Sequence, residues 1–135
     1  MNQDLTLKLF LVDDDEFDAM AFDRALKKSG MNYSLSHCNQ ATKALEIIQD
    51  GEFDLVFLDY QMPGTDGLSL LKKFKGLGVM APIAIMTSQG DERIAVEMMK
   101  AGAFDYFPKN EITGESLSKV IRAGLRLREI GRAHV

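Results

Sequence analysis

The chain contains 135 residues, of which 46% are hydrophobic and 27% are charged, and its formal net charge is -4. This length predicts one domain with a single core. The acidic balance disfavours nucleic acid as a direct ligand, because phosphate backbones are held mainly by clustered Lys and Arg side chains. Cys38 is the only cysteine, which excludes an intramolecular disulfide and a metal site built on several thiolates.

The sequence predicts neither a membrane span nor a secretion signal. No stretch approaches the roughly 20 apolar residues that a membrane-spanning helix needs, and the first residues lack the layout of a signal peptide. We therefore expect a soluble, cytoplasmic protein with no membrane partner. The charge is uneven, since 13 of the 20 acidic residues lie within the first 66 positions and 11 of the 16 basic residues follow them. The late basic excess indicates a docking surface.

Apolar runs alternate with segments of helical spacing along the chain. Three runs have the length and texture of central parallel strands, and two further strands fit the same pattern. In chain order, the five predicted strands are Leu7–Val12, Tyr33–Cys38, Leu55–Leu58, Ile83–Met86 and Phe104–Phe107. The pattern therefore predicts strands at regular intervals, separated by segments long enough for helices.

Five helices are predicted after these strands. The first three are marked by apolar residues at helical spacing, namely Phe17, Met20, Ala21 and Leu26, then Ala41, Ala44, Leu45 and Ile48, then Leu68, Leu71 and Phe74. The last two cover roughly Asp91–Lys100 and Glu115–Ile130. Glycines fall where these helices should end: Gly30, Gly51, Gly76, Gly78 and Gly102.

Alternating strands and helices predict an α/β fold. Right-handed crossovers place the helices on both faces of a parallel sheet. We therefore expect a doubly wound, five-stranded parallel sheet with five helices on two faces, in one domain over residues 1–135. In open sheets of this kind, ligands bind beyond the carboxyl ends of the strands.

Acidic residues follow two of the predicted strands. Asp13, Asp14 and Asp15 come directly after the first strand, and Asp59 follows the third. The simplest interpretation of the first three is a cap for the next helix, which favours negative charge at its N-terminus, but this does not explain Asp59. Crowded carboxylates repel one another unless a cation relieves them. Mg²⁺ is the natural candidate, because it is held by one or two carboxylates together with water and phosphate.

A hydroxyl group and an amino group are expected at the same edge. Thr87 and Ser88 follow the fourth strand, and Lys109 follows the fifth. Phosphoryl transfer needs an aligned nucleophile and positive charge around the equatorial oxygens, which a metal, a hydroxyl and an ammonium would supply. Asp59 is the expected nucleophile, because an aspartate can carry a transient acyl phosphate.

Four motifs carry these residues. They are L-F-L-V-D-D-D at Leu9–Asp15, D-L-V-F-L-D-Y-Q-M-P-G-T-D-G at Asp54–Gly67, I-A-I-M-T-S at Ile83–Ser88 and A-G-A-F-D-Y-F-P-K at Ala101–Lys109. Together they resemble the receiver domain of two-component response regulators, of the chemotaxis-regulator-like kind, over nearly the whole chain. The resemblance implies the flavodoxin-like strand order 2-1-3-4-5.

The resemblance also implies roles for individual residues. Asp59 would be phosphorylated, with Mg²⁺ bound directly by Asp14 and Asp59 and through water by Asp13. The remaining implied roles are a metal ligand from the backbone carbonyl of Gln61, phosphoryl contacts from Thr87 and Lys109, and a conformational switch formed by Thr87 and Tyr106. The domain would catalyse only its own phosphorylation and dephosphorylation, so it is not expected to be an enzyme for external substrates.

One departure from the family pattern concerns Lys109. Receivers commonly have a proline directly after this lysine, with a cis bond that aims it into the site, whereas Asn110 stands here. A cis bond before a residue other than proline costs about 3 kcal/mol. Either that strain is tolerated, or the bond is trans and the loop differs.

Partners and rival functions follow from the resemblance. The expected partners are a sensor histidine kinase or phosphotransfer protein and an output domain or partner protein. A homodimer through the fourth helix, fifth strand and fifth helix is also expected. Separately, we expect the last helix to have been trimmed from a longer multidomain protein. The rival is a Mg²⁺-dependent phosphohydrolase that forms an aspartyl phosphate. Such enzymes usually place an acid two residues after the nucleophile to protonate the leaving group, and here that position is Gln61.

Overall fold

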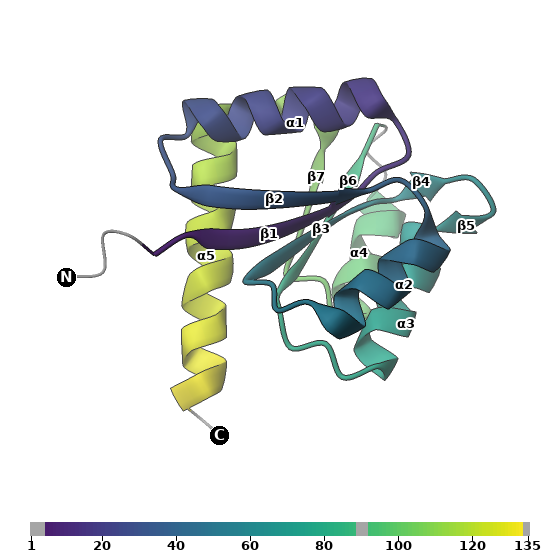
Figure 1. Ribbon diagram of the computed structural model, residues 1–135. Coiled ribbons are helices and arrows are strands. Elements are labelled where there is room, and N and C mark those ends of the chain that lie inside the picture. Colours follow the sequence, from purple (N-terminus) through teal and green to yellow (C-terminus); the bar gives the residue numbers. More distant parts are fainter. Residues whose placement is uncertain (1–4, 89–91, 134–135) are drawn as a thin grey trace.

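The computed structural model describes residues 5–88 and 92–133. Five parallel strands form one sheet in the order β2-β1-β3-β6-β7 (Figure 1). Their bounds are β1 Leu7–Val12, β2 Tyr33–Cys38, β3 Leu55–Asp59, β6 Ile83–Thr87 and β7 Asp105–Pro108. This arrangement confirms the predicted fold, because its strands, counted without the hairpin described below, run 2-1-3-4-5. Within the described residues, no helix is long and apolar enough to cross a lipid bilayer.

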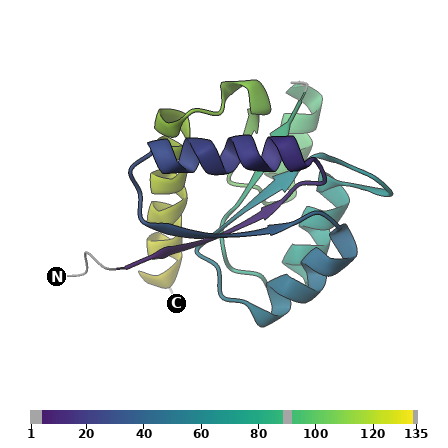
Figure 2. The same cartoon turned by 45° about the horizontal axis from the view of Figure 1, so that its top comes forward.

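Five helices cover the two faces of the sheet. They are α1 Glu16–Lys28, α2 Ala41–Asp50, α3 Gly67–Gly76, α4 Glu92–Lys100 and α5 Gly114–Ala133. Figures 1 and 2 show α1 and α5 on one face and α2, α3 and α4 on the other. Residue Asp91, the predicted start of the fourth helix, lies outside the described residues. The remaining predicted helices are confirmed to within a few residues.

The core has two layers because successive strand residues point to opposite faces of a sheet. Phe10 and Leu58 pack with α2, α3 and α4 on one face, while Leu11 and Phe57 pack with α1 and α5 on the other. All of these side chains are fully buried. Both faces of the central strands are therefore covered, which explains why those strands read as continuous apolar runs.

The predicted apolar face of the first helix was wrong in part. Phe17 is 82% exposed and Met20 is 56% exposed, whereas Leu26 is fully buried. The buried face consists of Ala19, Phe22, Ala25 and Leu26. Phe17 and Met20 lie on the same side of α1, as their spacing indicates, but the helix packs on the sheet with a different side.

Two short elements were not predicted from the sequence. The strands β4 Gln61–Met62 and β5 Thr65–Asp66 form an antiparallel hairpin directly after β3. The hairpin closes tightly, because a Cβ added to Gly67 would lie 2.7 Å from Cα of Tyr60. A single 3-10 turn, η1, covers Lys109–Glu111. Both elements lie at the carboxyl ends of strands, so they shape the edge where the acidic residues were expected.

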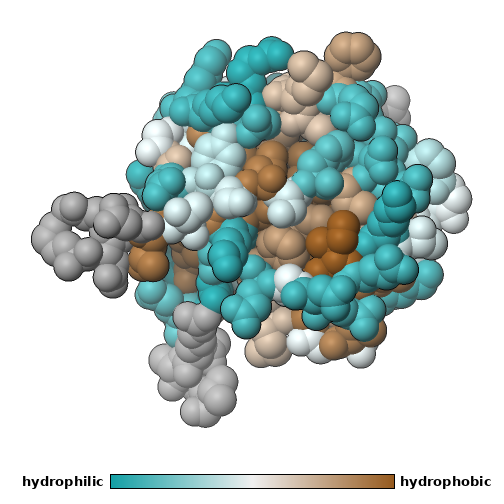
Figure 3. Space-filling view, in the orientation of Figure 1, coloured by the Kyte–Doolittle hydropathy of each residue, from teal (hydrophilic) through white to brown (hydrophobic). Residues whose placement is uncertain are grey.

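Helix α5 is 20 residues long and packs one apolar stripe against the sheet. Leu117 and Ile121 are fully buried, while Leu127 and Ile130 are 49% and 51% exposed. Figure 3 shows apolar side chains in the middle of this face, between hydrophilic ones, and further apolar groups at its upper and lower edges. The distal half of α5 therefore carries apolar groups beyond those that the core requires.

Candidate functional site

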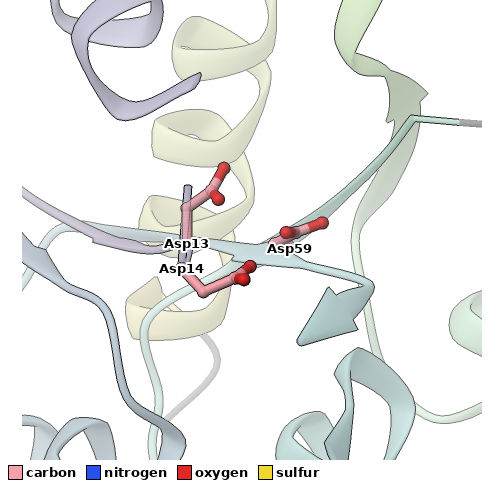
Figure 4. A group of neighbouring side chains, drawn as sticks. All are labelled: Asp13, Asp14 and Asp59. Carbon is pink, nitrogen blue, oxygen red and sulfur yellow. The ribbon is translucent and has the colours of Figure 1, made fainter. Parts of the chain in front are cut away.

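Three carboxylates meet at the carboxyl edge of the sheet. Asp13 and Asp14 follow β1 and Asp59 ends β3, and Figure 4 shows their side chains gathered in one space. One carboxylate oxygen from each residue lies within 4.8 Å of the others. Asp13 is 1% exposed and Asp59 is 3% exposed, and Asp14 is more open to solvent. The register explains the meeting, since Val12 lies beside Leu58 in the sheet.

Lys109 reaches into this cluster from the end of β7. Its Nζ lies 2.8 Å from Oδ2 of Asp13, 2.7 Å from Oδ2 of Asp18 and 3.2 Å from Oδ2 of Asp59. The bond to Asn110 is trans, as no cis peptide occurs in the described chain. The second of the two alternatives therefore holds: the bond is trans, η1 forms the loop, and the amino group still enters the site.

In each of the two buried carboxylates, Asp13 and Asp59, the oxygen that does not contact Lys109 accepts a hydrogen bond from a backbone amide. The amide of Asp15 donates to Oδ1 of Asp13 over 2.9 Å, and the amide of Gln61 donates to Oδ1 of Asp59 over 3.2 Å. The carboxylate of Asp14 has no hydrogen bond or ion pair to any described residue. Asp14 is thus the member of the cluster whose oxygens are free to take a ligand.

The site is short of positive charge. Burial and the neighbouring Asp13 charge raise the pKa of Asp59 to about 6, although Lys109 and the Gln61 amide oppose this shift. Burial alone would lower the pKa of Lys109, but its bonds to Asp13 and Asp18 outweigh that effect and raise it. One lysine therefore faces several carboxylates, and the arrangement favours a further cation.

Thr87 lies on β6, next to β3 in the sheet, and Tyr106 lies on β7, next to β6. Thr87 ends β6, is 1% exposed and pairs with Pro108 of β7. Tyr106 is half-buried beside Ile85 and packs against the core layer under α2, α3 and α4. The sheet thus carries both predicted switch residues at or near the edge that holds Asp59.

Ser88 contributes a contact at the mouth of the site. Its Oγ donates to Oε1 of Gln61 over 2.8 Å, which joins the end of β6 to the hairpin. The Gln61 side chain is a neutral amide that does not ionise near neutral pH, so it cannot act as a general acid toward a leaving group. The amide at position 61 is the residue on which the sequence argument against a hydrolase rests.

The sequence reasoning missed two residues of the site. Asp18 binds Lys109 across 91 positions of sequence, and Nε2 of His37 lies 2.8 Å from the backbone oxygen of Asp13. The sequence signal for Asp18 was only an acid in the first turn of a helix, which the helix dipole explains by itself. Nothing in the spacing of His37 distinguishes it from an ordinary strand residue.

Comparison with known proteins identifies this geometry. A family model described as the response regulator receiver domain matches residues 9–122. The chain belongs to the response regulator receiver domain family. It is therefore a response regulator receiver domain, and no comparison favours the phosphohydrolase alternative.

Curated relatives of this receiver domain are longer than the chain. It is 38% identical over 122 residues to the DNA-binding transcriptional regulator NtrC of Proteus hauseri, covering 90% of this chain and 25% of the relative. It is 34% identical over 121 residues to the transcriptional regulatory protein FixJ of Bradyrhizobium diazoefficiens, covering 90% of this chain and 58% of the relative. The receiver domain thus spans about a quarter of the first relative and just over half of the second.

Solved structures share its fold. A CheY-like receiver domain protein from Methanospirillum hungatei JF-1 has a TM-score of 0.82 at 24% identity, with coverage of 94% of this chain and 99% of that one. A receiver domain protein from Clostridium thermocellum has a TM-score of 0.81 at 25% identity, with coverage of 92% and 98%. The CheY-like arrangement therefore extends over nearly the whole receiver domain.

Proposed function

We propose that this receiver domain accepts a phosphoryl group on Asp59 and uses it to change its surface. The observation that carries the proposal is the pairing of Asp59 with Lys109, whose Nζ lies 3.2 Å from Oδ2. In the proposed step, an Asp59 oxygen attacks phosphorus, the bond from phosphorus to the donor's imidazole nitrogen breaks, and the nitrogen keeps the electron pair. Lys109 offsets the charge on the transferred group.

We further propose a magnesium site formed by Asp14, Asp59, the Gln61 carbonyl and, through water, Asp13. The donor set fits, because carboxylate oxygens are ligands that Mg²⁺ accepts and it commonly keeps several waters. Of the two acids after β1, Asp13 already binds protein groups with both oxygens, whereas the Asp14 carboxylate has no hydrogen bond or ion pair to a described residue, which supports direct binding by Asp14 and binding through water by Asp13. When bound, Mg²⁺ would neutralise charge on the phosphoryl oxygens.

Thr87 and Tyr106 are the proposed switch. The hydroxyl of Thr87 would bind a phosphoryl oxygen, and Tyr106 would turn inward into the space that Thr87 leaves. Thr87 is almost fully buried and its strand neighbour β7 carries Tyr106, which supports communication between them. The surface formed by α4, β7 and α5 would then engage an output domain, a partner protein or a second copy of the chain.

The proposed phosphodonor is a sensor histidine kinase or a phosphotransfer protein in the cytoplasm. Family membership supports a kinase of this class, because receiver domains act in two-component signalling. The catalysis would be confined to phosphorylation and dephosphorylation of Asp59 itself. A regulatory role is therefore proposed, in preference to turnover of external substrates.

Intact-protein mass spectrometry after incubation with acetyl phosphate and Mg²⁺ tests the acceptor. The unaltered chain should gain one phosphate, and Asp59→Asn should gain none. Asp50→Asn, at an exposed position at the end of α2, is the control and should be phosphorylated like the unaltered chain. Full phosphorylation of Asp59→Asn would reject the assignment.

A beryllofluoride mimic tests the switch separately. We expect Thr87→Ala to retain some phosphorylation of Asp59, because the nucleophile and metal ligands remain. Its NMR shifts around Tyr106 on adding the mimic should be much smaller than those of the unaltered chain. Shifts of full size in Thr87→Ala would show that Thr87 does not report the phosphate.

A further inference from the structure

A recess opens at the amino-terminal edge of the sheet, on the opposite side of the molecule from Asp59. Its volume is about 630 Å³, and its walls come from the ends of α2 and α3, the loops before β6 and β7, and α5. Small-molecule sites usually enclose roughly 300–1,000 Å³. The recess contains none of the residues assigned to phosphorylation, so it is a separate feature of the domain.

The walls of the recess are mainly apolar. Ile48 is buried and Phe53 and Val79 are half-buried, so they form a floor. Met80 and Leu127 flank this floor and are 82% and 49% exposed. Large apolar side chains left open around a concave surface are typical of a site that covers an apolar ligand.

Lys75 brings one available positive charge to this recess. The side chain stretches over Gly102, because a Cβ added there would lie 2.9 Å from Cε of Lys75. Its amino group has no hydrogen bond or ion pair to a described residue. The side chain is open to solvent, yet partial burial lowers the pKa of its amino group. Lys75 therefore offers an unpaired ammonium beside apolar walls.

The other two charged residues of the recess are accounted for differently. Arg128 is bound to the carboxylate of Asp54, which also accepts the Lys8 amide over 2.8 Å, so its charge is already balanced. Glu52 is exposed on the wall and has no ion pair to any described residue. An anion that enters would be attracted by Lys75 and weakly repelled by Glu52.

We propose that this recess binds a small amphipathic carboxylate, with its apolar body against Phe53, Val79 and Leu127 and its carboxylate on Lys75. The apolar walls supply most of the binding by removing hydrocarbon from water. The ammonium selects an acid over a neutral molecule of the same length. Such a ligand would bind this domain independently of phosphorylation at Asp59.

Octanoate is a suitable probe, and amide NMR of the whole 135-residue chain is the measurement. We expect octanoate to shift the amides of Phe53, Val79 and Leu127 and to leave those of Asp13 and Asp59 unchanged. The neutral analogue octanol should bind more weakly by about fivefold, a factor within the range of a partly exposed ion pair. No shift at the recess below the micelle concentration would reject the site.

Variants separate the charge from the apolar walls. Lys75→Met keeps the stem over Gly102 but should weaken octanoate binding about fivefold and leave octanol binding unchanged. Glu52→Gln should tighten octanoate slightly, and Met80→Asp, at a position that is 82% exposed, should weaken it. Lys72→Met, on the same helix but outside the recess, is the matched control.

Three outcomes would overturn the assignment even if the recess binds something. Equal affinities for octanoate and octanol would mean an apolar recess without selectivity for anions. Unchanged octanoate affinity in Lys75→Met, with the thermal midpoint also unchanged, would remove Lys75 from the site. A loss of affinity in Lys72→Met as large as that in Lys75→Met would indicate a general effect of net charge.

Discussion

The two edges of the sheet use charged residues in opposite ways. At the carboxyl edge, Asp13, Asp18 and Asp59 share Lys109, Asp14 has no ion pair to any described residue, and the cluster keeps an excess of negative charge. At the amino edge, Asp54 is matched by Arg128 and by a backbone amide. The first arrangement is poor for stability and suits a cation and a phosphoryl group. The second is balanced and holds α5 to the sheet.

The largest expected effect is on stability, when the positively charged residue of each edge, Lys109 or Arg128, is replaced. Lys109→Met should destabilise the metal-free domain by about 3 kcal/mol, because it leaves buried carboxylates unpaired. Arg128→Met should cost about 1 kcal/mol, because both partners of its ion pair are partly exposed. Urea denaturation gives both values.

Magnesium distinguishes the two variants further. Added Mg²⁺ should restore part of the stability lost in Lys109→Met, since a cation can replace the missing charge. It should restore none of the loss in Arg128→Met. Equal recovery in both variants would mean that the acidic cluster is not the place where Mg²⁺ stabilises the domain.

A smaller effect is expected from packing at the amino edge. A Cβ added to Gly124 on α5 would overlap Cδ2 of Leu55 and lie 2.9 Å from Cζ of Phe104. We expect Gly124→Ala to destabilise the domain by about 2 kcal/mol, as overpacking outweighs the better helix propensity of alanine. Thermal and urea unfolding measure the change.

Gly76 is the matched control for this substitution. It ends α3, and a Cβ there would meet no atom within 4 Å. Gly76→Ala should therefore leave stability unchanged or raise it by about 0.5 kcal/mol. A loss in Gly76→Ala comparable to that in Gly124→Ala would contradict the packing argument.

The roles of Asp13 and Asp14 at the acidic edge can be separated by comparing how much each contributes to Mg²⁺ affinity. Asp13→Asn should weaken Mg²⁺ binding on the order of tenfold, the lower end for an outer-shell partner. Asp14→Asn should weaken it more, because Asp14 is the proposed direct ligand. Isothermal titration or NMR gives the ranking, and Glu52→Gln at the opposite edge serves as the control. Identical Mg²⁺ affinities in all variants would mean that the cluster does not bind Mg²⁺ and only caps the N-terminus of α1.

The smallest effect concerns Tyr33, whose hydroxyl donates to Oδ1 of Asp23 over 2.6 Å. Burial, together with the Asp23 bond and charge, raises the pKa of Tyr33 to about 12 from its usual value of 10.0. The folded state therefore holds this proton more tightly than the unfolded chain does. The stabilising contribution is fully present below pH 10 and is lost as the pH rises from about 10 to 12.

Absorbance at 295 nm measures the titration of Tyr33. The difference between the unaltered chain and Tyr33→Phe should be small at pH 11, because Tyr33 remains mostly protonated. The other two of the three tyrosines serve as internal references. A difference titration centred near pH 10 would mean that the bond to Asp23 does not persist in solution.

The sequence by itself determined the order of elements and the edge of the sheet at which the acidic residues meet. Nearly continuous apolar runs and the helical spacing between them predicted the parallel sheet, and the parallel arrangement brings the residues after Val12, Leu58 and Met86 to one edge. The same rule predicted that Lys109, at the end of the fifth strand, lies at this edge. These are consequences of local pattern and of the topology that pattern permits.

Only the tertiary structure decided which of these groups touch. The stripe of α1 that packs depends on how the helix docks, so Phe17 stays exposed and Phe22 is buried. The Lys109 bond to Asp18 joins residues 91 positions apart, and no local pattern encodes a contact across that separation. The recess beside Lys75 is formed by several segments whose distances are set by packing of the whole core. Charge balance at each edge is therefore a property of the fold, because it depends on which side chains the packing brings within a few ångströms.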